Sequence, residues 1–376
     1  MPQSHATHKK LRKMIQRLAA KPLFEIGKNS RYDFSQLMKL PIAGALENRS
    51  IENQSLLKGR VSADDFYHHF KNKLGMDPIR RLFHRHISEV KRILGSGWSQ
   101  QMLTIAIDKT EDSYWGETDN PFVTGGKRDS STNFAFRQLT ASIVLRGQRF
   151  LIYLRALTDK DTNDALLVED CLEELRKLGF RVGTVLMDRE FYNGTIIIVC
   201  NIRKIVYLVP AVKNERFERL VEGLRKEGKA LPRIIENYEI VDEVTNLIIF
   251  EEKTSKGEIE VFGFITNMKA VEIAKDVDAI IELYRLRWGI ENAHKYEDSF
   301  KIPTNSTDGI IRFFFFVIGV ILHNLWVLLN LLSESLGTIA ISLNLMKDIL
   351  KVAYGFMMLQ SYKHPQRERW VKILLG

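Results

Sequence analysis

The chain has 376 residues, of which 45% are hydrophobic and 27% charged, and its formal net charge is +9. This composition is near the globular average and excludes a wholly disordered, collagen-like or small disulfide-stapled protein. The positive charge is uneven, because residues 1–100 hold 19 Lys and Arg against 8 Asp and Glu. A basic N-terminal module indicates a polyanionic partner, either nucleic acid or an acidic membrane surface.

The cysteines and histidines give little support for a zinc site. Cys171 and Cys200 are far apart and form no Cys-x-x-Cys pattern, so neither a disulfide framework nor a thiolate zinc site is expected. This usage fits a reducing, cytoplasmic compartment. The N-terminus, MPQSHATHKKLRK, lacks the apolar run of a secretory signal. The N-terminal histidines lie among Arg and Lys and are better explained as helix-surface residues than as zinc ligands: His68, His69, His84 and His86.

The predicted elements change character after a Gly-Ser-Gly linker at 95–97. Residues 8–95 are predicted to be basic helices, and 102–109 a buried strand. Next come a hairpin (139–146 and 149–157), a helix (163–179), a strand (182–188), a short helix (192–202), a strand (205–210), three strand-like runs (234–267) and helices near 271–298, 309–332 and 341–358. This order predicts an α/β core with antiparallel strands first, parallel strands later and a small β insertion.

One predicted helix is apolar enough to resemble a membrane span. Residues 313–332 read FFFFVIGVILHNLWVLLNLL, which is long enough to cross a bilayer. His323, Asn324 and Asn330 interrupt it, and no second such segment exists in the sequence. We therefore interpret it as a helix buried inside a soluble domain, with a single-span membrane protein as the alternative.

Two aspartates are predicted at strand ends. Asp108 lies near the end of the first buried strand, and Asp188 at the end of the strand at 182–188. Open sheets of this kind carry functional groups where strands end and side chains meet solvent. For Asp188 an equally good interpretation is a cap of the turn that follows.

A later helix carries a polar face. At about 100° per residue, Tyr284, Arg287, Glu291, Lys295 and Asp298 share one side of the segment YRLRWGIENAHKYEDSFK (284–301). The alternative is a solvated face linked by i,i+4 pairs. Two strand-end aspartates and a glutamate on a helix are what a two-metal phosphoryl-transfer site requires, because Mg²⁺ and Mn²⁺ prefer hard oxygen ligands.

Three segments together resemble a known family. IAIDKT, VLMDREFYNG and YRLRWGIE are similar to the catalytic blocks of prokaryotic DDE transposases, specifically the insertion-sequence branch marked by a Tyr-x-x-Arg-x-x-x-Glu-x-x-x-x-x-x-Lys helix. The acidic residues follow in order, 80 and then 103 residues apart, with the β insertion before the glutamate. The resemblance covers about residues 103–332.

The resemblance implies a fold, a site and partners. The fold is a ribonuclease-H-like mixed sheet with a β insertion at about 212–268, within a catalytic domain at 100–360, after an N-terminal helical DNA-binding domain at 1–95. Asp108, Asp188 and Glu291 match the catalytic triad that binds two Mg²⁺ or Mn²⁺ ions. The implied function is cleavage at the terminal inverted repeats of an insertion sequence and joining of the ends to target DNA, by a protein that is a dimer in its DNA complex, located in the prokaryotic cytoplasm with the nucleoid.

The resemblance also implies DNA contacts, with one departure. Tyr284 and Arg287 match positions that hold the DNA backbone near the cleaved end. The family lysine is replaced by Asp298, so Lys295 or Lys301 is expected to supply that charge. Separately, Lys127 and Arg128, together with Arg137, are candidate phosphate contacts or members of a solvated loop.

Competing functions follow from the same residues. A ribonuclease-H-like nuclease that cuts DNA without joining it shares the triad, although the Tyr–Arg helix face argues against it. A decayed copy that binds DNA without catalysis is supported by Asp298 alone.

Overall fold

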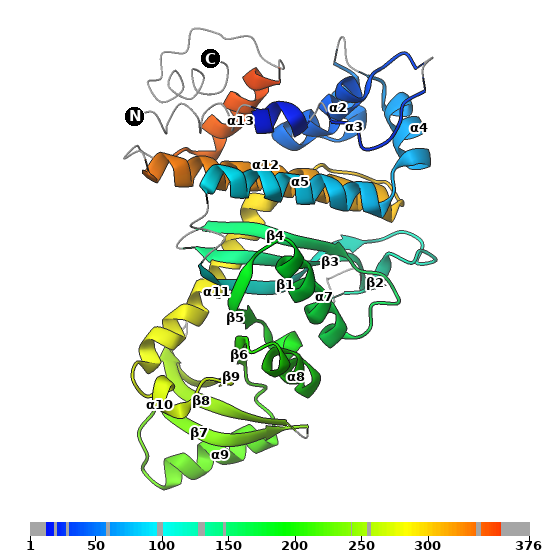
Figure 1. Cartoon of the computed structure of the whole chain (residues 1–376). Helices are drawn as coiled ribbons and strands as arrows, with labels where there is room; N and C mark the ends of the chain where they lie inside the picture. Colours follow the sequence, from blue (N-terminus) through cyan, green and yellow to red (C-terminus); the bar gives the residue numbers. More distant parts are fainter. Residues whose placement is uncertain are drawn as a thin grey trace. The chain divides into compact units, whose positions relative to one another are not determined.

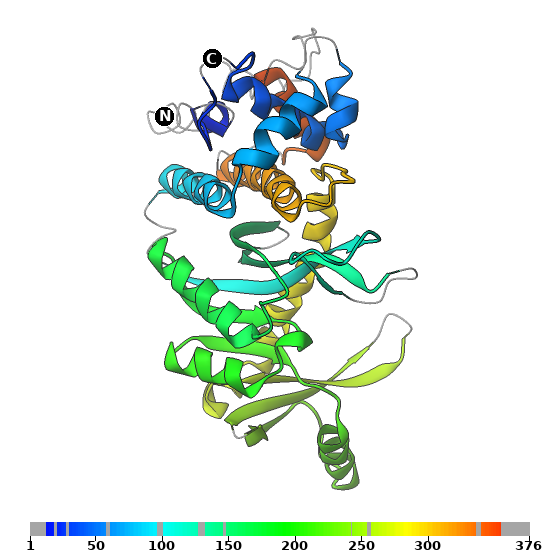
Figure 2. The same cartoon turned by 90° about the vertical axis from the view of Figure 1, so that its right-hand side faces the viewer.

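The computed structural model describes residues 13–18, 21–27, 30–57, 61–95, 101–126, 132–145, 148–241, 243–253, 257–335 and 340–354. The chain divides into two compact units, which are described separately (Figures 1 and 2). One unit is Gln100–Ile290, and the other combines Met1–Ser99 with Glu291–Gly376.

The unit Gln100–Ile290 is built on one mixed sheet of β-strands (Figure 1). Within the described residues its strands are β1 (Met102–Tyr114), β2 (Val123–Gly125), β3 (Phe134–Leu145), β4 (Gln148–Ala156), β5 (Arg181–Met187), β6 (Val206–Pro210), β7 (Arg233–Ile240), β8 (Glu243–Lys253) and β9 (Ile259–Thr266). Their order is β2-β3-β1-β5-β6-β9-β8-β7, with β4 paired to β3.

Strand directions agree with the sequence prediction. β3 and β4 form the antiparallel hairpin, and β1 is antiparallel to β3. β5 is parallel to both β1 and β6. The three strands of the predicted insertion continue the same sheet, because β9 pairs antiparallel with β6. The predicted α/β class with a ribonuclease-H-like mixed sheet is confirmed.

Helices cover both faces of this sheet (Figures 1 and 2). They are α7 (Asp164–Lys177), the 3₁₀ turn η1 (Arg189–Phe191), α8 (Gly194–Ile202), α9 (Glu215–Lys226), α10 (Ala270–Ile273) and α11 (Val277–Asp298), the last of which extends beyond the unit. α7 and α8 lie against one face. α11 packs on the other through Ile280, Ile281 and Tyr284, which join a core with Ala106 and Leu186.

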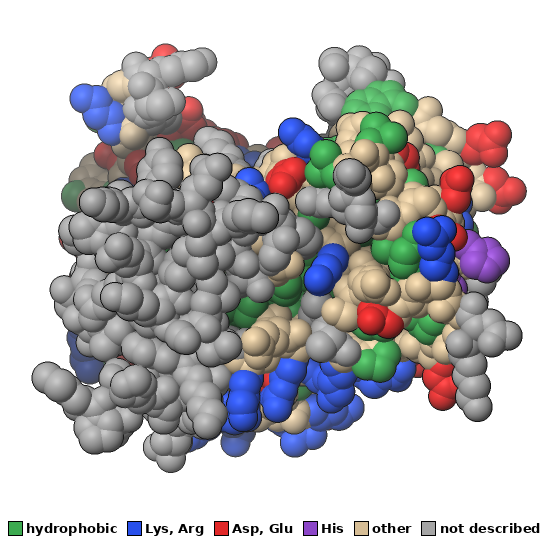
Figure 3. All heavy atoms as spheres, turned by 90° about the horizontal axis from the view of Figure 1, so that it is seen from above, with side chains coloured by type: hydrophobic (Ala, Val, Ile, Leu, Met, Phe, Trp, Pro, Cys, Tyr) green, Lys and Arg blue, Asp and Glu red, His purple; other side chains and the backbone are tan. Residues whose placement is uncertain are grey.

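The other unit is helical. Its helices are α2 (Phe34–Glu47), α3 (Ile51–Ser55), α4 (Ala63–Lys73), α5 (Met76–Leu94), α12 (Gly309–Ser335) and α13 (Leu343–Ala353). α12 packs against α2 and α5, and α13 against α2. Phe66 stacks on Phe70 at 4.2 Å between ring centres, and Phe70 meets Phe314 at 5.1 Å. Figure 3 shows Lys and Arg side chains gathered along the lower edge of the view.

α12 is the apolar helix singled out in the sequence. Among the described residues one helix is long and apolar enough to cross a membrane, and 78% of its most apolar window is buried by the protein. Its polar interruptions are buried as well, with Asn324 at 0% and Asn330 at 2% exposure. The side-chain oxygen of Asn330 accepts a hydrogen bond from the Ile341 backbone N–H at 2.7 Å. Internal pairing of this kind suits a helix in a protein core.

The compact units differ from the predicted domain bounds. One unit begins at Gln100, and Glu291–Gly376 groups with Met1–Ser99, whereas the predicted catalytic domain spans 100–360. The reason is the apolar surface of α12, which is buried against α2 and α5. The assignment of DNA binding and catalysis to separate domains stays a prediction.

Candidate active site

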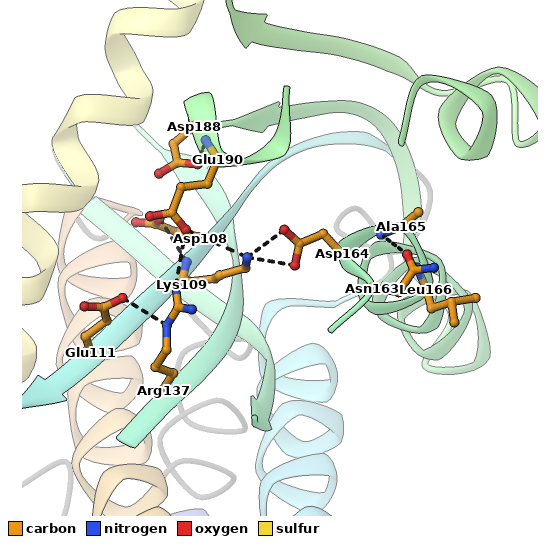
Figure 4. A network of polar contacts seen from close by, with 10 residues as sticks. All are labelled: Asp108, Lys109, Glu111, Arg137, Asn163, Asp164, Ala165, Leu166, Asp188 and Glu190. Atoms are coloured by element: carbon orange, nitrogen blue, oxygen red, sulfur yellow. Dashed lines mark hydrogen bonds and ion pairs between the residues drawn. The ribbon is translucent and has the colours of Figure 1, made fainter. Parts of the chain in front are cut away.

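Asp108 and Asp188 directly follow the last pair of the parallel ladder between β1 and β5. β5 ends there, but β1 continues to Tyr114, so the predicted strand end at Asp108 is wrong. The reason is that β1 stays paired with β3 as far as Tyr114. Ile107 of β1 lies opposite Met187 of β5, so Asp108 and Asp188 are the next residues along the two strands. Both side chains are half-buried. The structure thus brings together two members of the predicted triad, and Figure 4 shows both near Glu190.

Asp188 also caps the turn that follows it. Its side-chain oxygen accepts a hydrogen bond from the Glu190 backbone N–H at 2.8 Å, at the start of η1. The cap interpretation of Asp188 is therefore confirmed, and the cap fixes its carboxylate where the negative charge of Asp108 acts on it. Asp108 is anchored locally, because its carboxylate accepts the Lys109 backbone N–H at 3.0 Å.

Several charged side chains lie close to Asp188 and act on its pKa. Burial raises the pKa of Asp188, and the negative charges of Asp108 and Glu190 raise it further. The Glu190 N–H and the positive charge of Arg287 act in the opposite direction. A carboxylate whose neighbours disfavour its ionised form is a strong candidate for binding a cation.

Lys109 links the site to helix α7. Its side chain is 9% exposed, and its ammonium pairs with the Asp164 carboxylate at 2.7 Å and with Glu190 at 3.8 Å (Figure 4). Asp164 lies in the first turn of α7, just after Asn163, which caps that helix. The contact therefore fixes β1 to α7 one residue beyond Asp108.

A second cation holds Glu190 from the side of β3. The Arg137 guanidinium pairs with Glu190 at 3.3 Å and with Glu111 of β1 at 2.9 Å (Figure 4). Arg137, one of the candidate DNA contacts, thus has carboxylate partners within the protein. Because Glu190 is bound by two cations, it fixes the turn that carries Asp188.

Tyr284 and Arg287 lie next to this edge on α11. Tyr284 is 3% exposed, and its hydroxyl donates to the Met187 carbonyl at 3.1 Å, directly before Asp188. The Arg287 guanidinium lies over the Tyr284 ring at 5.3 Å. Burial raises the pKa of the Tyr284 hydroxyl. The hydroxyl of Tyr284 points toward the end of β5, and its role as a DNA contact stays a prediction.

Arg149 is a buried cation that sequence reasoning missed. It lies on β4, is 2% exposed, and burial lowers its pKa to about 10. The positive charge of Arg287 lowers that pKa further, while the negative charge of Asp108 raises it. The charges of Arg149, Arg287 and Asp108 thus act on one another near the end of the parallel ladder. One feature of the sequence could have pointed to it: Arg149 stands alone at the start of an apolar strand. A buried arginine needs carboxylates nearby.

A cavity of about 380 Å³ opens beside Asp188. It is lined by Asp188, Arg189, Glu190, Pro210, Ala211, Lys213, Phe250, Glu252, Phe262, Gly263, Phe264, Ile281, Tyr284, Arg285 and Arg287. The rings of Phe264 and Tyr284 are 4.3 Å apart, and the Lys213 ammonium lies 4.4 Å from the centre of the Phe262 ring. β8 and β9 supply these phenylalanines, so the insertion forms one wall of the cavity.

The remaining predicted residues stay predictions. The α11 backbone continues through Glu291 and Lys295 to Asp298, but their side chains lie outside the described residues, as do Lys127 and Arg128. Lys301 is exposed in the other compact unit.

The described donors suit a hard cation. Asp108 and Asp188 offer carboxylate oxygens, the ligands that Mg²⁺ and Mn²⁺ prefer. Burial, together with the negative charges of Asp108 and Glu190, raises the pKa of Asp188. Within the described part of the chain no three His, Cys, Asp or Glu side chains form a group that could hold a metal. Asp108 and Asp188 are therefore two of the three predicted metal ligands.

The comparisons with known proteins bear on this geometry. No curated protein matches the chain. A solved structure that it resembles is the cryo-EM structure of piggyBac transposase in a synaptic complex with hairpin DNA, with a TM-score of 0.55, 12% identity, and coverage of 98% of this chain and 83% of that one. This likeness concerns the fold. The family model described as the transposase DDE domain matches residues 99–325. Because that match spans more than half of the sequence, the chain belongs to the transposase DDE domain family.

Proposed function

We propose that this protein is the transposase of a prokaryotic insertion sequence, of the branch with the Tyr-Arg-Glu-Lys helix. It cleaves DNA at the terminal inverted repeats of its element and joins the freed ends to target DNA. The observation that carries the proposal is the pair Asp108 and Asp188 on neighbouring parallel strands, where the ladder between β1 and β5 stops, in a chain of the transposase DDE family. The bacterial cytoplasm, with the nucleoid, is the location that fits this function.

In this proposal Asp108, Asp188 and Glu291 hold two divalent ions, Mg²⁺ or Mn²⁺. Two such ions activate the attacking oxygen and stabilise the leaving oxygen of a phosphodiester. The protein contributes geometry: η1 fixes Asp188 through the Glu190 N–H, and the contact of Lys109 with Asp164 fixes β1. Arg287 lies beside the carboxylates and is suited to bind a DNA phosphate there.

The cavity beside Asp188 supports a nucleic-acid substrate. Aromatic faces stack on bases and cations bind phosphates, and both kinds of side chain line it. Lys295, Lys301, Lys127 and Arg128 are proposed as further backbone contacts. The N-terminal residues 1–95 are proposed to bind the terminal repeats. Two ends must be brought together, so we expect a dimer in the DNA complex.

The test is a cleavage and joining assay on a supercoiled plasmid that carries the coding sequence with its native flanking DNA. With Mg²⁺, the wild-type protein is expected to nick and release the element, and EDTA is expected to stop the reaction. Asp108→Asn, Asp188→Asn and Glu291→Gln are each expected to abolish cleavage while DNA binding persists. Asp170→Asn, on the exposed side of α7, is the matched control and should cleave normally.

Each outcome has a definite meaning. Retained cleavage in one of the three variants removes that residue from the site. Cleavage without insertion into a target plasmid supports the nuclease alternative. Binding without cleavage by the wild-type protein supports the decayed copy, and Asp298→Lys should then restore activity if the missing lysine is the cause.

A further inference from the structure

Helix α5 separates apolar from basic residues. One face is buried: Ile79, Leu82, Phe83, His86, Ile87, Val90 and Ile93. The other carries six basic side chains, all exposed or half-buried: Arg80, Arg81, His84, Arg85, Lys91 and Arg92. Its single carboxylate after the first turn is Glu89. A helix of this kind is fixed to the unit by its apolar face and presents positive charge to the outside.

A groove of about 930 Å³ runs beside this helix, within the same compact unit. Arg17 and Lys21 line one side, and Arg81 and Arg85 line the other. The Arg17 guanidinium pairs with the Glu89 carboxylate at 2.9 Å, which keeps the segment 13–18 next to α5. A guanidinium has five N–H donors, so an ion pair with Glu89 uses only some of the donors of Arg17.

The positively charged side chains of α5 lie close enough to repel one another. Burial lowers the pKa of Arg85, and the charge of Arg81 lowers it further, while Glu89 opposes both effects. The His86 ring at the base of the groove is 6% exposed, and burial lowers its pKa to about 3, so it stays neutral. Its Nε2 has no hydrogen-bond partner among the residues that the structure describes. Such a surface gains stability when an anion binds.

We propose that this groove and the basic face of α5 bind the sugar–phosphate backbone of duplex DNA. Arg81, Arg85 and Arg92 follow one line of the helix over about 16 Å, at 1.5 Å per residue. Along the duplex axis that length corresponds to about five base-pair rises of 3.4 Å, so the row can contact the phosphates that face it. A row of cations on this scale suits a regular polyanion better than a single small anion. The identification of the polyanion as DNA rests on the proposed function.

An acidic membrane is the other surface that a basic helix can meet. A helix that lies in a membrane interface inserts apolar side chains beside its charges. In the described part of the chain, no exposed large hydrophobic residue lies on α5 or within residues 13–18 and 21–23. Positive charge without exposed apolar anchors favours DNA.

The test measures binding of the full-length protein to a fluorescent 30-base-pair duplex of arbitrary sequence, by anisotropy in EDTA over a range of salt concentrations. Arg81→Glu/Arg85→Glu is expected to weaken binding by about tenfold or more, and to reduce the slope of log affinity against log salt by about two. The matched control is Arg176→Glu/Lys177→Glu, which makes the same change of charge on two exposed cations of α7. It should leave affinity and slope near those of the wild type.

Unchanged affinity and slope in the α5 variant would overturn the proposal, as would equal losses in both variants. Binding to vesicles with 30% phosphatidylserine, lost in the α5 variant while duplex binding persists, would assign the face to a membrane. If the α5 variant does not melt cooperatively, Arg81→Gln/Arg92→Gln replaces it under the same criterion. Because EDTA removes metal ions, this test measures binding alone and does not depend on catalysis. A protein that binds DNA through α5 but does not cleave it would refute the proposed function and leave this proposal standing.

Discussion

The hydroxyl of Tyr284 offers a sharp test of how the catalytic edge is built. Tyr284→Phe removes the bond to the Met187 carbonyl and leaves the ring in its contacts with Phe264 and Arg287. The hydrogen bond is buried, and its loss leaves the Met187 carbonyl, directly before Asp188, without the hydroxyl that donates to it. We therefore expect the free energy of unfolding to fall by about 1–2 kcal/mol.

The loss should be visible as a change in melting temperature. For a unit of this size, 1 kcal/mol corresponds to about 2–4 °C, so a fall of about 2–8 °C is expected. Tyr284→Ala also removes the ring and should cost about 3–5 kcal/mol. Calorimetry without metal gives the stability, and anisotropy with nicked and intact duplexes gives the affinity. A wild-type melting temperature combined with weaker binding of nicked DNA would refute this reasoning and make Tyr284 a DNA contact.

Three other predictions concern the same edge. Because the pKa of Asp188 is raised in the folded protein, its ionisation costs stability as pH rises through that pKa; Asp188→Asn should therefore melt higher than wild type without metal, by a margin that grows from pH 4 to pH 7. Lys109→Met breaks the contact with Asp164 and should cost about 1–3 kcal/mol in urea unfolding, whereas exposed Lys177→Met should cost under about 0.5 kcal/mol. Arg287→Ala should weaken binding of nicked DNA more than intact duplex, and equal losses would argue against an end-specific role.

The positions of the two aspartates could be predicted because each follows three buried residues in an apolar run. Parallel neighbours in one sheet then bring the two carboxylates to the same edge of the ladder. The continuation of β1 to Tyr114 was missed, because residues 109–114 are mostly polar. The hairpin of β3 and β4 could also be predicted, because its two apolar runs are separated by a short polar connection.

Contacts between distant segments could not be predicted. Lys109 was passed over, because its partner Asp164 lies 55 residues away. The inward direction of Tyr284 depends on how α11 is rotated against the sheet, and a helical face shared with Arg287 does not fix that rotation. Helix α9 was missed although Phe217, Leu220, Val221 and Leu224 follow the i, i+3, i+4, i+7 spacing of an amphipathic helix.

The pairing of β6 with β9 makes the insertion a continuation of the catalytic sheet rather than a separable module. A shortened chain without residues 212–268 would leave β6 as an open, apolar edge strand, which is the kind of edge that recruits other chains and aggregates. It would also remove the wall of the cavity formed by Phe250, Phe262 and Phe264. Efforts to reduce this protein to a minimal catalytic core should therefore trim the hairpin tip between β8 and β9 and keep the strands themselves.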